Sequence, residues 1–86
     1  MSETNLLNVI NGLTYGERIV RMCNTPRTTT ELRESFEKWT SNILIYMGSS
    51  FSEHIRQLEA AKVIQFDKGT WTLTKEGRIV VEKYLG

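Results

Sequence analysis

Hydrophobic positions recur at helical spacing near the start of the chain. The first group spans residues 4–10 and stops at Asn11-Gly12, which predicts a short helix capped by Thr4. In a second group, Thr14 and Glu17 have the spacing of a capping box, in which each side chain satisfies a free amide of the first turn. This second helix is expected to end at Asn24-Thr25-Pro26, because the residue before a proline avoids helical geometry.

The longest apolar stripe lies within residues 28–47. Thr28 and Glu31 form another capping box at its start. Apolar residues then follow at steps of four, three, four and four, as one helix face requires: Leu32, Phe36, Trp39, Ile43 and Met47. The weak helix formers Thr40-Ser41-Asn42 interrupt the stripe, so we expect either one long kinked helix or two short ones. Gly48 is expected to end the segment as a left-handed cap.

A third capping box, Ser50 with Glu53, opens a helix predicted over about residues 50–62. Phe51, Ile55 and Leu58 lie at i, i+4 and i+7 and form its inward stripe. That phase turns the polar residues outward or sideways, namely Ser50, Ser52, Glu53, His54, Arg56 and Gln57.

Beyond residue 62 the pattern changes from helical spacing to alternation. Residues 63–66 have strand character, and Asp67-Lys68-Gly69 is a turn signal. Trp71 and Leu73 alternate with threonines, which suits a strand with one buried face. Thr74 is placed to cap a last helix over residues 75–85.

Composition narrows the class of protein. A chain of 86 residues makes one domain, over residues 1–86, and 40% hydrophobic with 24% charged residues is ordinary for a soluble globular protein. No apolar run approaches the roughly 18 residues that span a bilayer, so no membrane association is expected. The start of the chain lacks a secretory signal pattern, and a single cysteine excludes an intrachain disulfide. These features predict a cytoplasmic protein.

The residues that carry catalytic or metal chemistry are scarce. One histidine, one cysteine and one aspartate are too few for a catalytic triad or a metal cluster. The six glycines are scattered rather than gathered in a phosphate-binding loop. We therefore expect no enzyme activity, no cofactor and no metal. Cys23 is interpreted as a small buried apolar residue rather than a redox switch.

Only Gly48 and Ser49 separate Met47 from Ser50. A helix that ends in glycine, a very short turn and a new serine-capped helix are the order of a helix-turn-helix, and here a hairpin follows. The chain resembles the winged helix-turn-helix regulators of bacteria and archaea, broadly the MarR, ArsR and PadR-like groups. Over residues 45–52 it also looks like small archaeal winged-helix chromatin proteins. The resemblance covers residues 45–81 and is carried by two runs, Ser52-x-His54-Ile55-x-x-Leu58-Glu59-x-Ala61-x-Val63-Ile64 and Leu73-Thr74-Lys75-Glu76-Gly77.

The resemblance implies an α+β fold, mostly α, with a recognition helix, a short β-hairpin wing over about residues 63–74 and a C-terminal helix. It also implies a sequence-specific transcriptional regulator that binds double-stranded DNA as a homodimer and is associated with the nucleoid. The recognition helix would enter the major groove, where arginine pairs with guanine and glutamine with adenine. The residues implied to contact DNA are Arg27, Thr28, Ser49, Ser50, Ser52, His54, Arg56, Gln57, Lys68 and Thr70.

The net charge of +1 is low for a nucleic-acid-binding domain. It leaves open a second interpretation, a winged-helix protein-protein interaction module that does not bind DNA. Two regions offer apolar surface for a subunit contact. Trp39 and Tyr46 form one, if they are not core residues. The two ends of the chain form the other, through Leu6, Leu7, Ile10, Tyr84 and Leu85.

Overall fold

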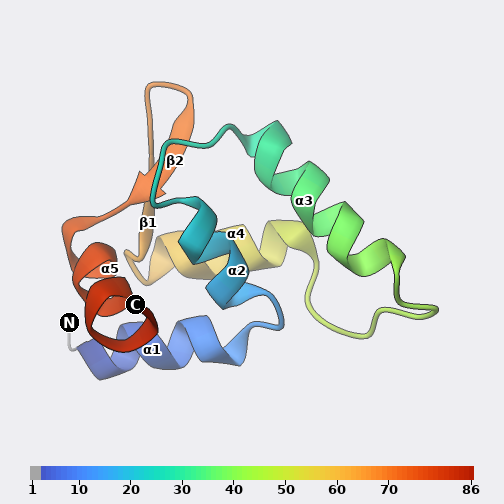
Figure 1. The fold of residues 1–86 in the computed structure, drawn as a ribbon, viewed down its shortest axis with the longest axis horizontal. Helices are drawn as coiled ribbons and strands as arrows, with labels where there is room; N and C mark the ends of the chain where they lie inside the picture. Colours follow the sequence, from blue (N-terminus) through green and yellow to red (C-terminus); the bar gives the residue numbers. More distant parts are fainter. Residues whose placement is uncertain (1–2) are drawn as a thin grey trace.

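Five α-helices, one π-helical turn and one β-hairpin make up residues 3–86, the part of the chain that the computed structural model describes (Figure 1). The fold is therefore α+β and mostly helical, as predicted. In chain order the elements are α1 (Glu3–Gly12), α2 (Gly16–Met22), α3 (Thr29–Ser41), α4 (Phe51–Ala60), β1 (Ile64–Asp67), β2 (Thr70–Leu73), α5 (Lys75–Val80) and the π-helical turn η1 (Val81–Leu85).

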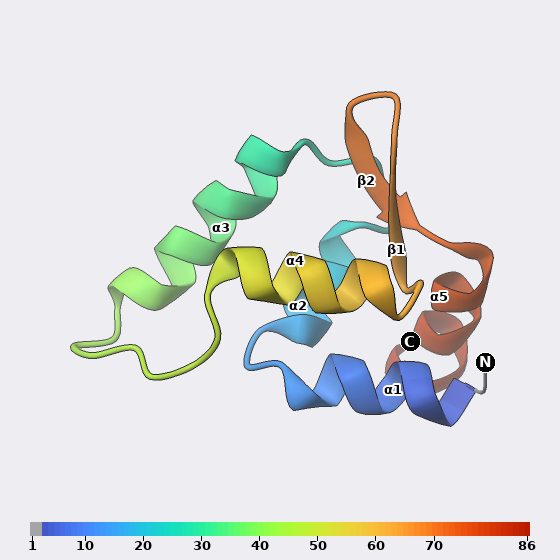
Figure 2. The same cartoon turned by 180° about the vertical axis from the view of Figure 1, so that it is seen from behind.

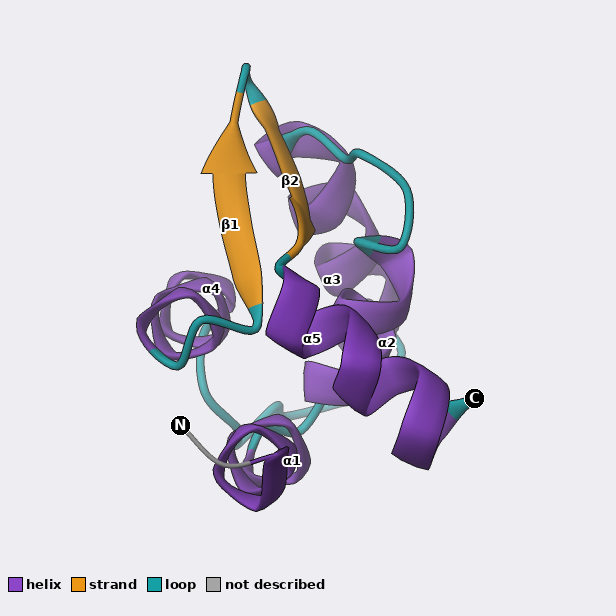
Figure 3. Cartoon of the chain, turned by 90° about the vertical axis from the view of Figure 1, so that its left-hand side faces the viewer, coloured by secondary structure: helices purple, strands orange, loops and turns teal. Residues whose placement is uncertain are grey.

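The core lies where α1, α2, α4 and α5 meet the base of the hairpin (Figures 1 and 2). Two parts project from it: the tip of the hairpin, and the linker between α3 and α4, which lies at one end of the longest axis. Viewed along that axis, α4 and α5 flank the hairpin on opposite sides (Figure 3). The buried apolar side chains are Leu6, Ile10, Leu13, Ile19, Val20, Cys23, Leu32, Phe36, Leu58, Ala61, Val63, Ile64, Trp71, Leu73 and Val80.

The start of α2 differs from the sequence prediction. Helix α2 begins at Gly16 with Tyr15 as its N-cap, and no side chain caps it, so the predicted box of Thr14 with Glu17 is wrong. The Glu17 carboxylate instead accepts a hydrogen bond from the Arg21 guanidinium at 2.9 Å. The connection from α1 is too tight for an earlier helix start, because the Gly16 amide donates to the Leu13 carbonyl at 3.1 Å.

The predicted start of α3 is confirmed, but its predicted extent is wrong. The Thr28 hydroxyl accepts from the Glu31 amide at 3.1 Å, and the Glu31 carboxylate accepts from the Thr28 amide at 2.9 Å. The helix ends at Ser41, so residues 28–47 form neither one long helix nor two short ones. The hydroxyls of Thr40 and Ser41 donate to carbonyls of the preceding turn, an arrangement that competes with helix continuation.

The linker, residues 42–50, is irregular. Gly48 does not adopt the expected left-handed conformation, since the positive backbone φ angles of the described residues belong to Lys62, Lys68 and Gly69. Its backbone packs so closely against Tyr46 and Thr14 that an added Cβ would displace them. The predicted tight helix-turn-helix connection is therefore replaced by a nine-residue segment that ends at the N-cap of α4.

The predicted hairpin is confirmed, with a shorter turn than the three-residue signal indicated. Asp67 pairs with Thr70, so only Lys68 and Gly69 form the turn. Their φ angles are 53° and 82°, the pattern of a type I′ turn that matches strand twist. Arg27 adds an isolated bridge to Trp71, with the Arg27 amide donating to the Trp71 carbonyl at 3.0 Å. The segment before α3 therefore braces the hairpin.

The end of the chain follows the predicted cap. The Thr74 hydroxyl accepts from the Gly77 amide at 2.9 Å and opens α5. After Val80 the helix changes to the π-helical turn η1, so the predicted helix over residues 75–85 is one helical path with two hydrogen-bond patterns.

Candidate nucleic-acid interface

Helix α4 lies across the molecule (Figure 2). One of its faces is buried against the core and the other is exposed. Its N-cap is Ser50, whose hydroxyl accepts from the Glu53 amide at 3.1 Å. His54 and Leu58 are fully buried, whereas Phe51 and Ile55 are half-buried. The predicted inward stripe is thus right for Leu58, but the buried face is centred on His54 and Leu58.

His54 does not face outward, so the expectation that it contacts DNA is wrong. Its side chain is 0% exposed, and its Nε2 accepts a hydrogen bond from the Tyr15 backbone amide at 3.2 Å. Because a backbone amide only donates, the ring proton must lie on Nδ1, which then donates to the Ser50 carbonyl 2.8 Å away. The imidazole supplies the acceptor that the uncapped start of α2 otherwise lacks.

Aromatic rings surround this histidine. The Phe36 ring lies edge-on at 5.0 Å between centroids, and the Tyr15 ring is stacked at 6.4 Å. Tyr15 in turn contacts Trp39 and Tyr46, with centroids 5.5 Å and 6.0 Å apart. The cluster joins the starts of α2 and α4 to the end of α3, and so fixes how α4 is presented.

The outer face of α4 carries a small polar network. The Glu53 carboxylate accepts from the Arg56 guanidinium, with Nε at 3.3 Å and Nη2 in closer contact, and from the Gln57 amide at 2.9 Å. The Arg56 hydrogen bonds, followed by the Gln57 hydrogen bond, lower the pKa of Glu53. The same pairing raises the pKa of Arg56. Ser52 is exposed one turn before Arg56.

Glu53 therefore orients Arg56 and Gln57 side by side. The predicted second half of the Ser50 capping box is not formed, because the Glu53 carboxylate binds these two side chains. The Arg56 side chain remains 67% exposed. Since a guanidinium has five N–H donors and two point at Glu53, three remain for a ligand.

Ser49 and Ser50 lie just before α4, and both serve the fold. The Ser49 carbonyl accepts from the Tyr46 hydroxyl at 2.6 Å, and the Ser50 hydroxyl is the helix cap. Ser50 is exposed and Ser49 is half-buried. The Ser50 hydroxyl only accepts in this cap, so its O–H can donate a hydrogen bond to a ligand at this end of α4.

A second group of predicted contact residues lies on the hairpin side. Lys68 is exposed at the tip, and the Thr70 hydroxyl donates to the Asp67 carbonyl at 3.1 Å. The Arg27 guanidinium donates from Nε to the Met22 carbonyl at 3.0 Å, so part of it is committed to the fold. Thr28 is engaged as the cap of α3. The predicted contact residues thus form two groups, one on α4 and one around the hairpin.

Arg33 is a candidate contact residue that the sequence reading missed. It is exposed on α3, and its guanidinium lies 5.7 Å from the centroid of the Phe51 ring, at the start of α4. The sequence places Arg33 beside Leu32, on the flank of the α3 stripe, but does not show that this flank lies next to α4.

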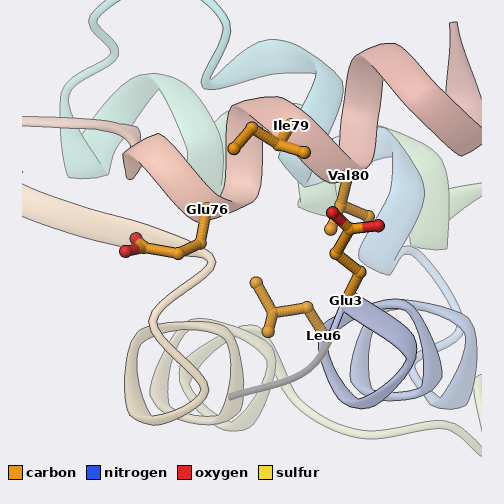
Figure 4. Close-up of a pocket in the computed structure, with 5 residues that line it drawn as sticks. All are labelled: Glu3, Leu6, Glu76, Ile79 and Val80. Atoms are coloured by element: carbon orange, nitrogen blue, oxygen red, sulfur yellow. The ribbon is translucent and has the colours of Figure 1, made fainter.

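A separate cavity of about 150 Å³ lies between α1 and α5 (Figure 4). Leu6 of α1 points toward α5, and the other lining residues are Glu3, Glu76, Ile79 and Val80. The Glu3 carboxylate is bound by Lys83 at 3.0 Å and by the Tyr84 hydroxyl at 3.2 Å. Across residues 3–86, no three His, Cys, Asp or Glu side chains are grouped as a metal site would need.

Within the described part of the chain, none of the helices has both the length and the apolar character needed to cross a membrane. The chain matches no protein-family model, no curated protein and no solved structure. Residue chemistry and geometry therefore carry the functional interpretation of the α4 face.

Proposed function

We propose that this protein is a winged-helix DNA-binding transcriptional regulator. In this proposal the outer face of α4 enters the major groove and the hairpin contacts the neighbouring backbone. One observation carries the proposal: α4 presents Ser52 and Arg56 to solvent, with the half-buried Gln57 beside them, from a helix whose opposite face is anchored in the core. The element order, with α3, α4 and then a projecting hairpin, supports it.

The side chains on this face suit base recognition. Arginine forms bidentate bonds with guanine and glutamine with adenine, and serine adapts to either. Glu53 holds Arg56 and Gln57 in fixed orientations before binding, which lowers the entropy lost on DNA. The negative charge of Glu53 also weakens the attraction of this face to phosphates, which favours contacts with bases over purely electrostatic binding to the backbone.

The hairpin suits a supporting backbone contact. Lys68 is exposed at the tip, and the Arg27–Trp71 bridge stiffens the hairpin from one side. The Trp71 indole donates to the Thr29 hydroxyl at 2.9 Å, which ties the same strand to the start of α3. The positive charge and exposure of Lys68 suit this tip to a phosphate contact.

Fluorescence anisotropy tests the proposal directly. Random-sequence duplex is titrated with protein at two salt concentrations, and the logarithm of affinity should fall by roughly 0.9 per logarithmic unit of salt for each phosphate neutralised. The Arg56→Ala, Gln57→Ala double variant should bind more weakly and keep its fold, because neither side chain is core. Arg21→Ala is the matched control, since Arg21 is an exposed arginine paired with a glutamate on another helix. Equal loss in both variants, or none in either, would refute the α4 assignment.

The second candidate is a protein-protein interaction module that does not bind DNA. It is favoured by the net charge of +1 and by the exposed apolar residues of the α3–α4 linker. This module would show no salt-dependent DNA binding above background in the same titration.

A further inference from the structure

The α3–α4 linker exposes consecutive apolar side chains. Leu44 is 100% exposed, Met47 87%, Ile45 69% and Ile43 40%. Isolated exposed apolar residues are ordinary, but a contiguous exposed group marks an interaction surface. The linker also projects at one end of the longest axis (Figure 2), with Tyr46 as the side chain that ties it to the core. We call residues 43–47 the apolar linker.

A groove of about 440 Å³ lies beside this linker, between α3 and α4. Phe36, Phe51 and Tyr46 give it aromatic walls. Arg33 and Glu37 lie along its α3 side, while Ser50 and Ser52 lie on the α4 side. The apolar linker cannot fill its own groove, because Tyr46 is part of the wall and Leu44 points fully into solvent.

We propose that the occupant of this groove is the apolar linker of a second copy of this chain. A projecting apolar segment and an aromatic groove lie next to each other on one surface. A two-fold axis between the segment and the groove brings the apolar linker of each copy into the groove of the other copy. This reciprocal geometry is that of a closed homodimer. Leu44 is the side chain that enters deepest, since it is the most exposed.

The area available fits a small dimer interface. Fully burying an aliphatic side chain removes roughly 60–120 Å² of apolar surface, so the apolar linker offers on the order of 300 Å². Two linkers and the two groove surfaces they cover come to roughly 1,200 Å², at the lower limit of stable interfaces. Because interfaces of this size are at the weak end, we expect the dimer to dissociate on dilution.

Electrostatics do not oppose this contact. The α3 side of the groove carries one charge of each sign, Arg33 and Glu37, so a two-fold copy can bring opposite charges together. The net charge of +1 also adds little repulsion between copies.

Sedimentation velocity of the full chain over a concentration series, without DNA, tests the proposal. The parent should dimerise, and Leu44→Asn should raise the dimer dissociation constant at least about tenfold, because it removes the apolar side chain that packs against the aromatic walls and must desolvate an amide in its place. Ser52→Trp should weaken the dimer from the other side by filling the groove. Both positions are exposed, so circular dichroism should show an unchanged fold.

Ile79→Asn is the control, because Ile79 is 40% exposed on α5, at the other end of the core. It should leave the dimer intact. A parent that stays monomeric at the highest concentration would overturn the proposal. A dimer that Ile79→Asn disrupts and Leu44→Asn does not would also overturn it and assign the contact to the terminal helices. Neither result depends on whether the protein binds DNA.

Discussion

Replacing His54 by alanine tests how α4 is anchored. The imidazole is fully buried, accepts from the Tyr15 amide at 3.2 Å and contacts the Ser50 carbonyl at 2.8 Å. Alanine removes the acceptor and leaves the Tyr15 amide with neither its partner nor easy access to water. An orphaned buried donor costs about 1–3 kcal/mol.

The lost ring adds a cavity term to this cost. Replacing a larger aromatic ring with alanine costs about 3–5 kcal/mol, so the smaller imidazole should cost somewhat less for packing alone. Together the two effects predict a loss of about 3–5 kcal/mol in the free energy of unfolding. For a domain of this size, a loss of about 3 kcal/mol lowers Tm by roughly 12–24 °C.

Urea denaturation followed by circular dichroism and by Trp39 and Trp71 fluorescence measures this loss. His54→Leu is the companion variant, because it keeps most of the volume and removes only the hydrogen bonds; it should lose about 1–3 kcal/mol. A His54→Ala variant within about 0.5 kcal/mol of the parent would behave like a surface substitution and refute the buried placement.

Three further predictions follow from the same contacts. Leu58→Ala should lower the free energy of unfolding by about 2–5 kcal/mol in urea titrations, since the side chain is fully buried; an unchanged transition would show that the inward face of α4 is wrong. Burial raises the pKa of the Cys23 thiol to about 12, against about 8.5 in the unfolded chain. The buried neutral thiol therefore contributes fully to the free energy of unfolding below about pH 8.5, and this contribution is lost as the pH rises toward 12. Compared with Cys23→Ala, the parent should lose stability more steeply over this range, and equal slopes in urea titrations would contradict the burial. Because Ser52 lies both in the proposed dimer groove and on the proposed DNA face, Leu44→Asn should raise apparent DNA affinity in anisotropy titrations at protein concentrations where the parent is dimeric; an unchanged affinity would separate the two surfaces.

The sequence predicted the helix starts and the hairpin well where neighbouring residues determine them. The start of α3 is set by Thr28 and Glu31, which satisfy each other's amides within one turn. The start of α5 is set by the Thr74 hydroxyl in the same way. The hairpin is set by a glycine turn between two alternating runs. Each of these decisions depends on residues within a few positions of one another.

The incorrect predictions concern places where contacts between distant segments form, or where an expected packing surface is missing. His54 lies three residues after Phe51 and four before Leu58, a spacing that places it on the inward face of the helix. Its polar side chain suggested an outward position, but the Tyr15 amide, 39 positions away, and the Ser50 carbonyl satisfy the buried imidazole. The amphipathic stripe beyond Ser41 has helical spacing but no surface to cover, so the backbone follows the local bonds of Thr40 and Ser41 instead. The bridge of Arg27 with Trp71 joins segments that no local pattern connects.

The candidate site was predicted in part for the same reason. Ser52 and Arg56 are exposed on one face of α4, with the half-buried Gln57 at its edge, because helical phase is local. Their grouping around Glu53 follows from spacings of three and four residues, which place side chains together on a helix. Arg33 reaches that region from another helix, so sequence spacing alone did not associate it with α4.

The most direct test of the central claim is an amide NMR titration of the full chain with a short DNA duplex at low salt. If the outer face of α4 enters the groove, the largest shift changes should map to Ser52, Arg56 and Gln57, with a second group around Lys68. Changes confined to residues 43–47, or none above those caused by an equal concentration of inorganic phosphate, would contradict the account.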